Sequence, residues 1–346
     1  MTSCGRERTR TLSLVRYHGD EAALPGMLDF AVNVRGSAPP PWLLDRLAAR
    51  LADLGRYPGA ADLRAATAAI AARHERSGDE VMLLAGATEA FSLLTNLRPR
   101  LAAVIGPSFT EPEAALTAAG VALTHVTLAP PFTLDSADVP VDADLVVVGN
   151  PTNPTAVLHP RKQILALRRP GRVVVVDEAF ADAIAGEPES LAGEPLADVV
   201  VLRSLTKTWA LPGLRVGYAL GAPDVLARLT MTRPHWPLGT LQLEALVACS
   251  QPQAVEEAAR QARALAGMRT QMCDALARVG ARVVEGHAPF VLFEVADAAL
   301  TRKRLAEKGI AVRRCDTFVG LDGHYLRAAV RPEWPNLVAA LSEILT

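Results

Sequence analysis

The stretch DVVVLRSLTKTWALPGLRVGYAL, residues 198–220, decides how the fold of this 346-residue chain is interpreted. Its first apolar run, 199–202, predicts a buried strand, and a Pro-Gly break precedes a second apolar run at 214–220. Lys207 follows the first strand, so apolar chain surrounds its stem. A desolvated lysine has a lowered pKa, and its neutral amine attacks carbonyl carbons. Most lysines that follow a strand are solvated, so the role of Lys207 depends on the rest of the chain.

The residues around Lys207 indicate which carbonyl compound it would bind. Hydroxyl groups at Ser204 and Thr206 and a guanidinium at Arg215 flank the lysine. Such groups are typical donors to phosphate oxygens. Pyridoxal 5′-phosphate combines an aldehyde with a phosphate, and the pattern therefore predicts this cofactor.

Composition and charge argue against several other classes of function. The chain carries 36 basic and 37 acidic residues, a net charge of −1, so we expect no nucleic-acid or membrane partner. The four cysteines form no C-x-x-C pair, which argues against a disulfide framework and against a metal site. We find neither a signal peptide nor an apolar run of ~18 residues. A cytoplasmic protein acting on small molecules is expected.

From residue 81 onward, short apolar strands alternate with helices. The runs at 173–176 and 199–202 are apolar throughout rather than alternating, which indicates strands covered on both faces. The pattern predicts the α/β class: a large domain with a mostly parallel sheet flanked by helices, and a smaller C-terminal α+β domain. In such sheets, ligands bind at the carboxyl ends of the strands.

Changes in pattern along the chain suggest four segments. They are an extended arm (1–40), a large cofactor-binding domain (41–235), a helical stretch (236–280) and the small domain (281–346). The first helices of the large domain (41–75) are expected to contribute to the small domain or to a dimer interface. Pro252 cannot donate to a helix, so it should divide the helical stretch near Ser250.

Polar residues gather where the predicted strands end. The turn at Ala87 and Thr88 opens a helix whose free N–H groups suit a phosphate, although an ordinary capped helix fits as well. Asn153 lies in a rigid turn between prolines and is either a donor to a ligand or a structural residue. Asp177 closes a buried strand, where a carboxylate needs a partner such as a protonated pyridine nitrogen. The alternative for Asp177 is an exposed loop position.

Three motifs resemble those of the fold type I pyridoxal-phosphate enzymes, in the class I/II aminotransferase family. They are N-P-T-N-P-T (150–155), D-E-A-F (177–180) and S-L-T-K-T-W-A-L-P-G-L-R-V-G-Y (204–218). The resemblance covers nearly the whole chain, from about His18 onward. It implies an aminotransferase-like fold and a pyridoxal 5′-phosphate enzyme, in which Lys207 holds the cofactor as a Schiff base and Asp177 pairs with the pyridine nitrogen.

The resemblance also implies roles for further residues. Asn153 would donate to the phenolic oxygen of the cofactor, and Phe109 would stack on its ring. Phe180 replaces a tyrosine whose hydroxyl donates to the same oxygen. Arg327 matches the arginine that binds the α-carboxylate of the substrate. The groups expected at the cofactor phosphate are Ser204, Arg215 and the backbone at Ala87 and Thr88.

Tyr57, in R-Y-P-G, matches a tyrosine that reaches the cofactor phosphate from a partner subunit, which implies a homodimer.

Within the family, three features resemble the threonine-phosphate decarboxylases of cobalamin synthesis. They are H-G (18–19) followed by L-D-F (28–30), D-E-A-F (177–180) and A-V-R (329–331). His18 and Arg35 would then help to bind a substrate phosphate, although a solvated turn fits His18 as well. Asn33 begins N-V-R-G where the family has N-x-N-P, and this segment lines the substrate side in relatives.

The expected function is therefore decarboxylation of a small amino-acid phosphate such as threonine phosphate. The alternative is a histidinol-phosphate aminotransferase or another class I/II aminotransferase. A non-catalytic module that senses pyridoxal phosphate is a third interpretation. Proteins of that kind carry a DNA-binding helix-turn-helix ahead of the body, and no such motif precedes the first predicted helix here.

Overall fold

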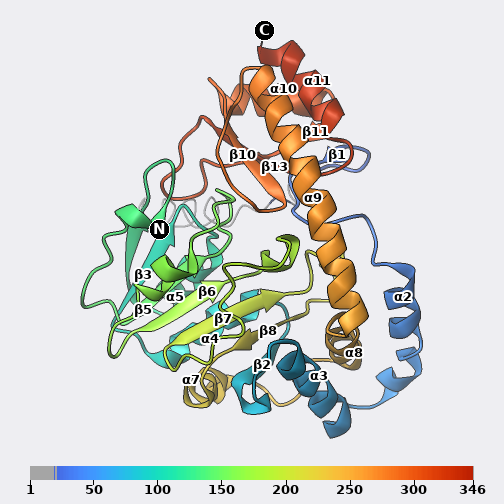
Figure 1. Ribbon diagram of the computed structural model, residues 1–346, viewed down its shortest axis with the longest axis vertical. Coiled ribbons are helices and arrows are strands. Elements are labelled where there is room, and N and C mark those ends of the chain that lie inside the picture. Colours follow the sequence, from blue (N-terminus) through green and yellow to red (C-terminus); the bar gives the residue numbers. More distant parts are fainter. Residues whose placement is uncertain (1–18, 20–21, 346) are drawn as a thin grey trace, which may run out of the picture.

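A seven-stranded sheet forms the larger part of the molecule in the computed structural model, which describes residues 19 and 22–345 (Figure 1). Its strands in spatial order are β2 (Val81–Leu84), β8 (Gly217–Leu220), β7 (Val199–Ser204), β6 (Val173–Asp177), β5 (Leu145–Gly149), β3 (Leu101–Gly106) and β4 (Ala122–Thr127). All neighbouring strands are parallel except β8, which is antiparallel to both of its neighbours. The prediction of a mostly parallel sheet is confirmed.

Both faces of the central strands β5, β6 and β7 are buried, which explains their continuous apolar runs. Val174 and Val201 belong to one apolar core and Val175 and Val200 to another, because successive strand residues point to opposite faces. Helices α2 (Pro41–Ala48), α3 (Ala60–Arg73), α6 (Arg161–Leu165) and α8 (Thr240–Cys249) contribute to the first core. Helices α4 (Thr88–Leu93), α5 (Glu111–Ala118) and α7 (Pro223–Leu229) contribute to the second. Short 3₁₀ turns lie at Leu51–Gly55, Gly78–Glu80, Leu94–Leu97, Leu134–Ser136, Ala181–Ala183 and Thr230–Thr232.

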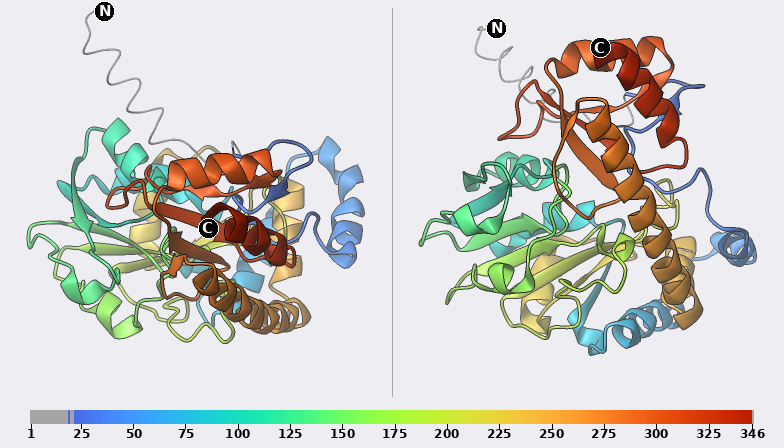
Figure 2. Two further views of the ribbon diagram at one scale, coloured as in Figure 1. Left: turned by 90° about the horizontal axis from the view of Figure 1, so that it is seen from above. Right: turned by 45° about the horizontal axis from the view of Figure 1, so that its top comes forward.

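The long helix α9 (Pro252–Arg278) leads from α8 to a C-terminal layer (Figure 2). The predicted helical stretch is thus divided at Pro252, as expected. The C-terminal layer contains an antiparallel sheet of β12 (Arg313–Arg314), β13 (Tyr325–Ala329), β10 (Phe290–Glu294) and β9 (Arg282–Val283), with α10 (Ala298–Glu307) and α11 (Trp334–Leu345). None of the helices within 22–345 is long and apolar enough to cross a membrane.

The N-terminal arm is tied into this C-terminal layer. Strand β1 (Leu28–Asp29) pairs in parallel with β11 (Ile310–Ala311), and Phe30 is buried in the core of the layer. The Ala329 N–H donates to the Phe30 carbonyl at 2.8 Å. Sequence periodicity did not predict this pairing, because each strand contributes only two residues.

A buried ionic network lies beneath the end of β7. Arg203 donates to Glu178 at 3.0 Å, to Glu187 at 2.6 Å, and also to Asp182. Arg73 from α3 donates to the same Asp182 at 3.0 Å. The side chain of Arg203 is 1% exposed, so the centre of the network that joins β6, β7 and α3 is shielded from water, whereas Glu187 at its edge is partly exposed.

Removal of the central cation should destabilise the fold strongly. We expect Arg203→Met to lower the free energy of unfolding by about 3–5 kcal/mol, because three carboxylates would lose a buried partner. The matched control is Arg161→Gln, which breaks an exposed pair with Glu194 at 2.6 Å and should cost about 1 kcal/mol or less. Urea unfolding measures both. Equal, small losses in the two variants would show that the network does not support the fold.

Candidate active site

A cavity of about 510 Å³ opens at the carboxyl ends of the parallel strands. Most residues singled out in the sequence line it, although they are far apart in the chain. They are Asn33, Ala87, Thr88, Phe109, Asn153, Asp177, Phe180, Ser204, Lys207, Arg215 and Arg327. The parallel sheet brings them together because strands that run in one direction end at one edge.

Asp177 and Lys207 lie at the centre of this edge, at the ends of neighbouring strands β6 and β7. Burial raises the pKa of Asp177 to about 6, whereas the Ala179 N–H at 3.1 Å and the charge of Lys207 act in the opposite direction. Asp177 is therefore mostly ionised at neutral pH. A buried carboxylate of this kind favours a cationic ligand group beside it.

A small polar recess lies between the turn after β2 and the turn after β7. Gly86 has φ +82°, and a Cβ at this position would lie 2.7 Å from Nη2 of Arg215, so only glycine lets the guanidinium reach the turn. The hydroxyls of Ser204 and Thr206 lie 2.7 Å apart in the same recess. One guanidinium, two hydroxyls and the backbone of the turn make a donor set that fits a phosphate.

Arg327 and Asn153 join the C-terminal layer to the large sheet across the cavity. Arg327 Nη1 donates to Oδ1 of Asn153, and its Nη2 donates to the Ala31 carbonyl at 2.7 Å. Burial lowers the pKa of Arg327 to about 10, so the guanidinium remains charged at neutral pH. Since Oδ1 of Asn153 accepts from Arg327, its amide N–H groups are the donors that a ligand would meet.

Aromatic side chains form the apolar walls. Phe109 packs against Phe91 with ring centroids 6.1 Å apart. Phe180 meets Phe290 edge-on, with centroids 5.0 Å apart. A flat aromatic ring of a ligand would fit between such walls, with the polar groups at its edges.

The structure places two of the predicted residues, Arg35 and Tyr57, apart from this cavity. Arg35 donates from Nη1 to Gln261 of α9, while its N–H donates to the Lys207 carbonyl at 3.0 Å. Tyr57 is 72% exposed and stacks on Trp236, with ring centroids 4.2 Å apart. His18 lies outside the described residues.

Asn33 sits on a turn that Asp29 organises. The carboxylate of Asp29 accepts the N–H groups of Ala31 and Val32 at 2.8 and 3.0 Å. Asn33 Oδ1 is buried and has no hydrogen-bond partner among the described residues. An unsatisfied acceptor in a cavity wall suits a ligand that donates a hydrogen bond.

Sequence reasoning missed one cation of the cavity wall, Arg313. This side chain is 3% exposed and lies directly opposite Arg327 in the β12–β13 pair, so both point to the same face. Its Nη2 donates to the Thr317 hydroxyl at 2.9 Å, and its guanidinium lies 5.0 Å from the centroid of Phe318. The consecutive arginines Arg313 and Arg314 were visible in the sequence, but which of the two faces the cavity depends on the strand register.

Comparisons with known proteins agree with this geometry. The chain is 63% identical to a histidinol-phosphate aminotransferase of Mycobacterium tuberculosis, covering 97% of this chain and 92% of the relative. It is 30% identical to the threonine-phosphate decarboxylase of Salmonella typhimurium, covering 92% of each. The crystal structure of the histidinol-phosphate aminotransferase from Clostridium acetobutylicum superposes with a TM-score of 0.85 at 24% identity, over 92% of this chain and 99% of that one.

The comparisons therefore support the aminotransferase alternative better than the expected decarboxylase. The family model described as aminotransferase class I and II matches residues 43–335, which is most of the chain. The donor set of the cavity fits the phosphate, ring and aldehyde of pyridoxal 5′-phosphate. The chain belongs to the class I and II aminotransferases, a family of pyridoxal-phosphate-dependent enzymes.

Proposed function

We propose that the protein is a histidinol-phosphate aminotransferase, which moves an amino group between histidinol phosphate and a 2-oxo acid. The 63% identity to a mycobacterial protein of that name supports this assignment over nearly the full length of both chains. The threonine-phosphate decarboxylase expected from the sequence is the second candidate, supported by 30% identity to the Salmonella enzyme. Both substrates carry a phosphate, so both candidates require a site for a substrate phosphate in the cavity.

In this proposal the residues of the large sheet hold the cofactor. Ser204, Thr206, Arg215 and the backbone at Ala87 and Thr88 bind its phosphate, and Asp177 pairs with the ring nitrogen. When bound, pyridoxal phosphate supplies an aldehyde that condenses with amines and a ring that stabilises negative charge on the adjacent carbon. Lys207 would hold the aldehyde, and its amine would move the proton at the substrate Cα.

The single observation that carries the substrate class is the pair of buried arginines, Arg313 and Arg327. They lie opposite each other on neighbouring strands and line the same cavity. Two adjacent guanidiniums match the double charge of a phosphate, and they also match the carboxylates of a 2-oxo acid. An amino donor with a phosphate and an acceptor with carboxylates can therefore use one wall in turn.

The two candidates are separated by their products. We expect the purified holoenzyme to convert histidinol phosphate and 2-oxoglutarate into glutamate, and to release no carbon dioxide from threonine phosphate. Arg313→Gln and Arg327→Gln should each raise KM for histidinol phosphate about 10- to 100-fold, as the loss of a charge-assisted hydrogen bond implies.

The control substrate is histidinol without its phosphate. If the arginines act on the phosphate, the two substitutions should affect histidinol much less than histidinol phosphate. Carbon dioxide and aminopropanol phosphate formed from threonine phosphate, with no glutamate from histidinol phosphate, would replace the proposed function by the decarboxylase.

Asp177 should make cofactor affinity depend on pH. A cationic ring nitrogen favours the carboxylate, so the pKa of Asp177, about 6 in this structure, should fall on binding. Below pH 6 the cofactor must displace a proton, and affinity should decrease by up to about tenfold per pH unit. Asp177→Asn has no such proton, so its pH profile between 5 and 7 should be flatter. Parallel profiles, measured as dissociation constants for pyridoxal phosphate, would contradict the role of Asp177.

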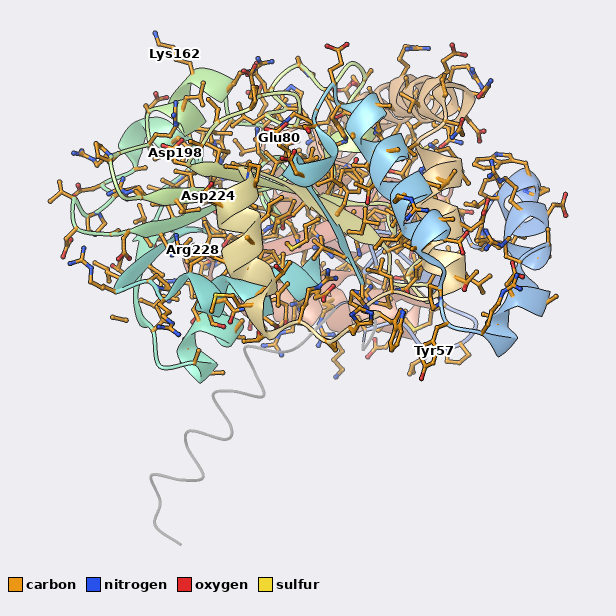
Figure 3. The ribbon with its side chains drawn as sticks, turned by 90° about the horizontal axis from the view of Figure 1, so that it is seen from below. Tyr57, Glu80, Lys162, Asp198, Asp224 and Arg228 are labelled. Carbon is orange, nitrogen blue, oxygen red and sulfur yellow. The ribbon has the colours of Figure 1, made fainter. Side chains whose placement is uncertain are left out.

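A homodimer is the assembly that we propose, with Tyr57 of each subunit directed at the other. The region around Tyr57 exposes apolar side chains, since Leu51 is 54% and Leu54 is 56% exposed. Tyr57 itself lies at the outer surface (Figure 3). A cluster of this kind is typical of a protein interface.

Light scattering after gel filtration should therefore give twice the mass of the chain. Leu51→Asp/Leu54→Asp should shift the protein toward a monomer, whereas Leu300→Asp, at a position 44% exposed on α10, should leave the mass unchanged. A wild-type protein that elutes as a monomer would exclude the dimer.

A further inference from the structure

An ion pair that the proposed chemistry does not use lies behind the turn at residues 86–88. Arg233 Nε and Nη2 each donate to the carboxylate of Glu89 at 2.8 Å. The side chains of Arg233 and Glu89 are only 10% and 21% exposed, so water screens the pair incompletely. Arg233 belongs to the connection between α7 and α8, far from Glu89 in the sequence.

Glu89 is built into the turn that follows β2. Its Oε2 accepts the Ala85 N–H at 2.7 Å, and its own N–H donates to the Gly86 carbonyl at 3.1 Å. The carboxylate therefore satisfies the backbone at the end of the strand and holds the shape of the turn. It also places a negative charge next to Ala87 and Thr88, whose backbone lines the recess proposed for the cofactor phosphate.

A carboxylate in this position would repel a phosphate unless its charge is balanced. Charges interact more strongly in partly buried surroundings than in water, and two hydrogen bonds from one guanidinium are a strong and directional way to neutralise a carboxylate. With Glu89 balanced, Arg215 remains as the cation that faces the phosphate. We infer that Arg233 is a positioning residue that cancels the charge of Glu89 and so preserves affinity for the cofactor phosphate.

The first turn of α8, which follows the connection that carries Arg233, supports the opposite side of the recess. Gln242 Nε2 donates to the Arg215 carbonyl at 2.7 Å, and its Oε1 accepts the Gly239 N–H at 2.6 Å. Arg215 has φ +58°, a conformation that an L-residue keeps only when its surroundings fix it. The segment from Arg233 to Gln242, which comprises this connection and the first turn of α8, thus contacts both halves of the proposed phosphate site. This links the segment to cofactor binding rather than to substrate choice.

The inference rests on the proposed cofactor site, and it is tested by affinity rather than by turnover. We would measure dissociation constants of the full-length protein for pyridoxal 5′-phosphate and for pyridoxal, which lacks the phosphate. Arg233→Gln should weaken binding of the phosphorylated form about tenfold, in the range of coupling between residues in contact, and change pyridoxal binding little. Glu89→Gln alone should not weaken binding, because the amide oxygen still accepts from Ala85. The double variant Glu89→Gln/Arg233→Gln should recover most of the affinity.

Two further variants separate charge from structure. Arg233→Lys retains the charge without the paired hydrogen bonds, so it should keep most of the affinity for pyridoxal 5′-phosphate. Arg161→Gln removes an exposed ion pair elsewhere and should behave as the wild type. Equal weakening of both ligands in Arg233→Gln, or a double variant no better than the single one, would overturn the inference. A wild-type protein that binds no pyridoxal 5′-phosphate would instead overturn the proposed cofactor site.

Discussion

The parallel pairing of β6 with β7 is the constraint on which the site depends. Asp177 pairs in register with Leu202, near the end of β7, and Lys207 follows in the turn after that strand. Both strands are apolar on both faces over most of their length, so Asp177 and Lys207 at their ends are partly shielded from water. A charge in such a region interacts strongly with its neighbours, and burial accordingly raises the pKa of Asp177 to about 6. The sheet thus determines the pKa of the carboxylate at its edge as well as the positions of the side chains.

The same strand supports the fold on one face and the site on the other. Arg203 and Ser204 are successive residues of β7 and point to opposite faces. Arg203 enters the ionic network with Glu178 and Asp182, whereas Ser204 lines the cavity. Because Glu178 follows Asp177 directly, the network also fixes the backbone that carries the carboxylate of the site. Stability and function are therefore coupled at this point through backbone geometry rather than through shared side chains.

Sequence reasoning predicted the features that depend on local pattern. Continuous apolar runs predicted the parallel sheet, and the motifs around Asn153, Asp177 and Lys207 predicted which strand ends meet. It failed where the direction of a side chain depends on the strand register, and where residues far apart in the sequence come into contact. Arg313 faces the cavity and Arg314 instead pairs with Asp316, because a strand alternates its faces with a period of two. Glu89 and Arg233 lie in two elements far apart in the sequence, and the periodicity of apolar residues gives no sign that they come into contact.

The arginines of the cavity wall are divided between the two layers of the molecule, and in the proposed function this division bears on the reaction. Arg215 belongs to the large sheet, whereas Arg313 and Arg327 belong to the C-terminal sheet and meet the large sheet through Asn153. A guanidinium accepts a carboxylate or a phosphate with similar geometry, so the arginines alone do not select the bond that breaks. The proposed substrate would select it, because histidinol phosphate has no α-carboxylate to lose and only its Cα–H bond can be broken next to the amine. For that substrate, amino transfer follows from the chemistry of the amine itself, and the protein has only to hold its phosphate and accept its proton.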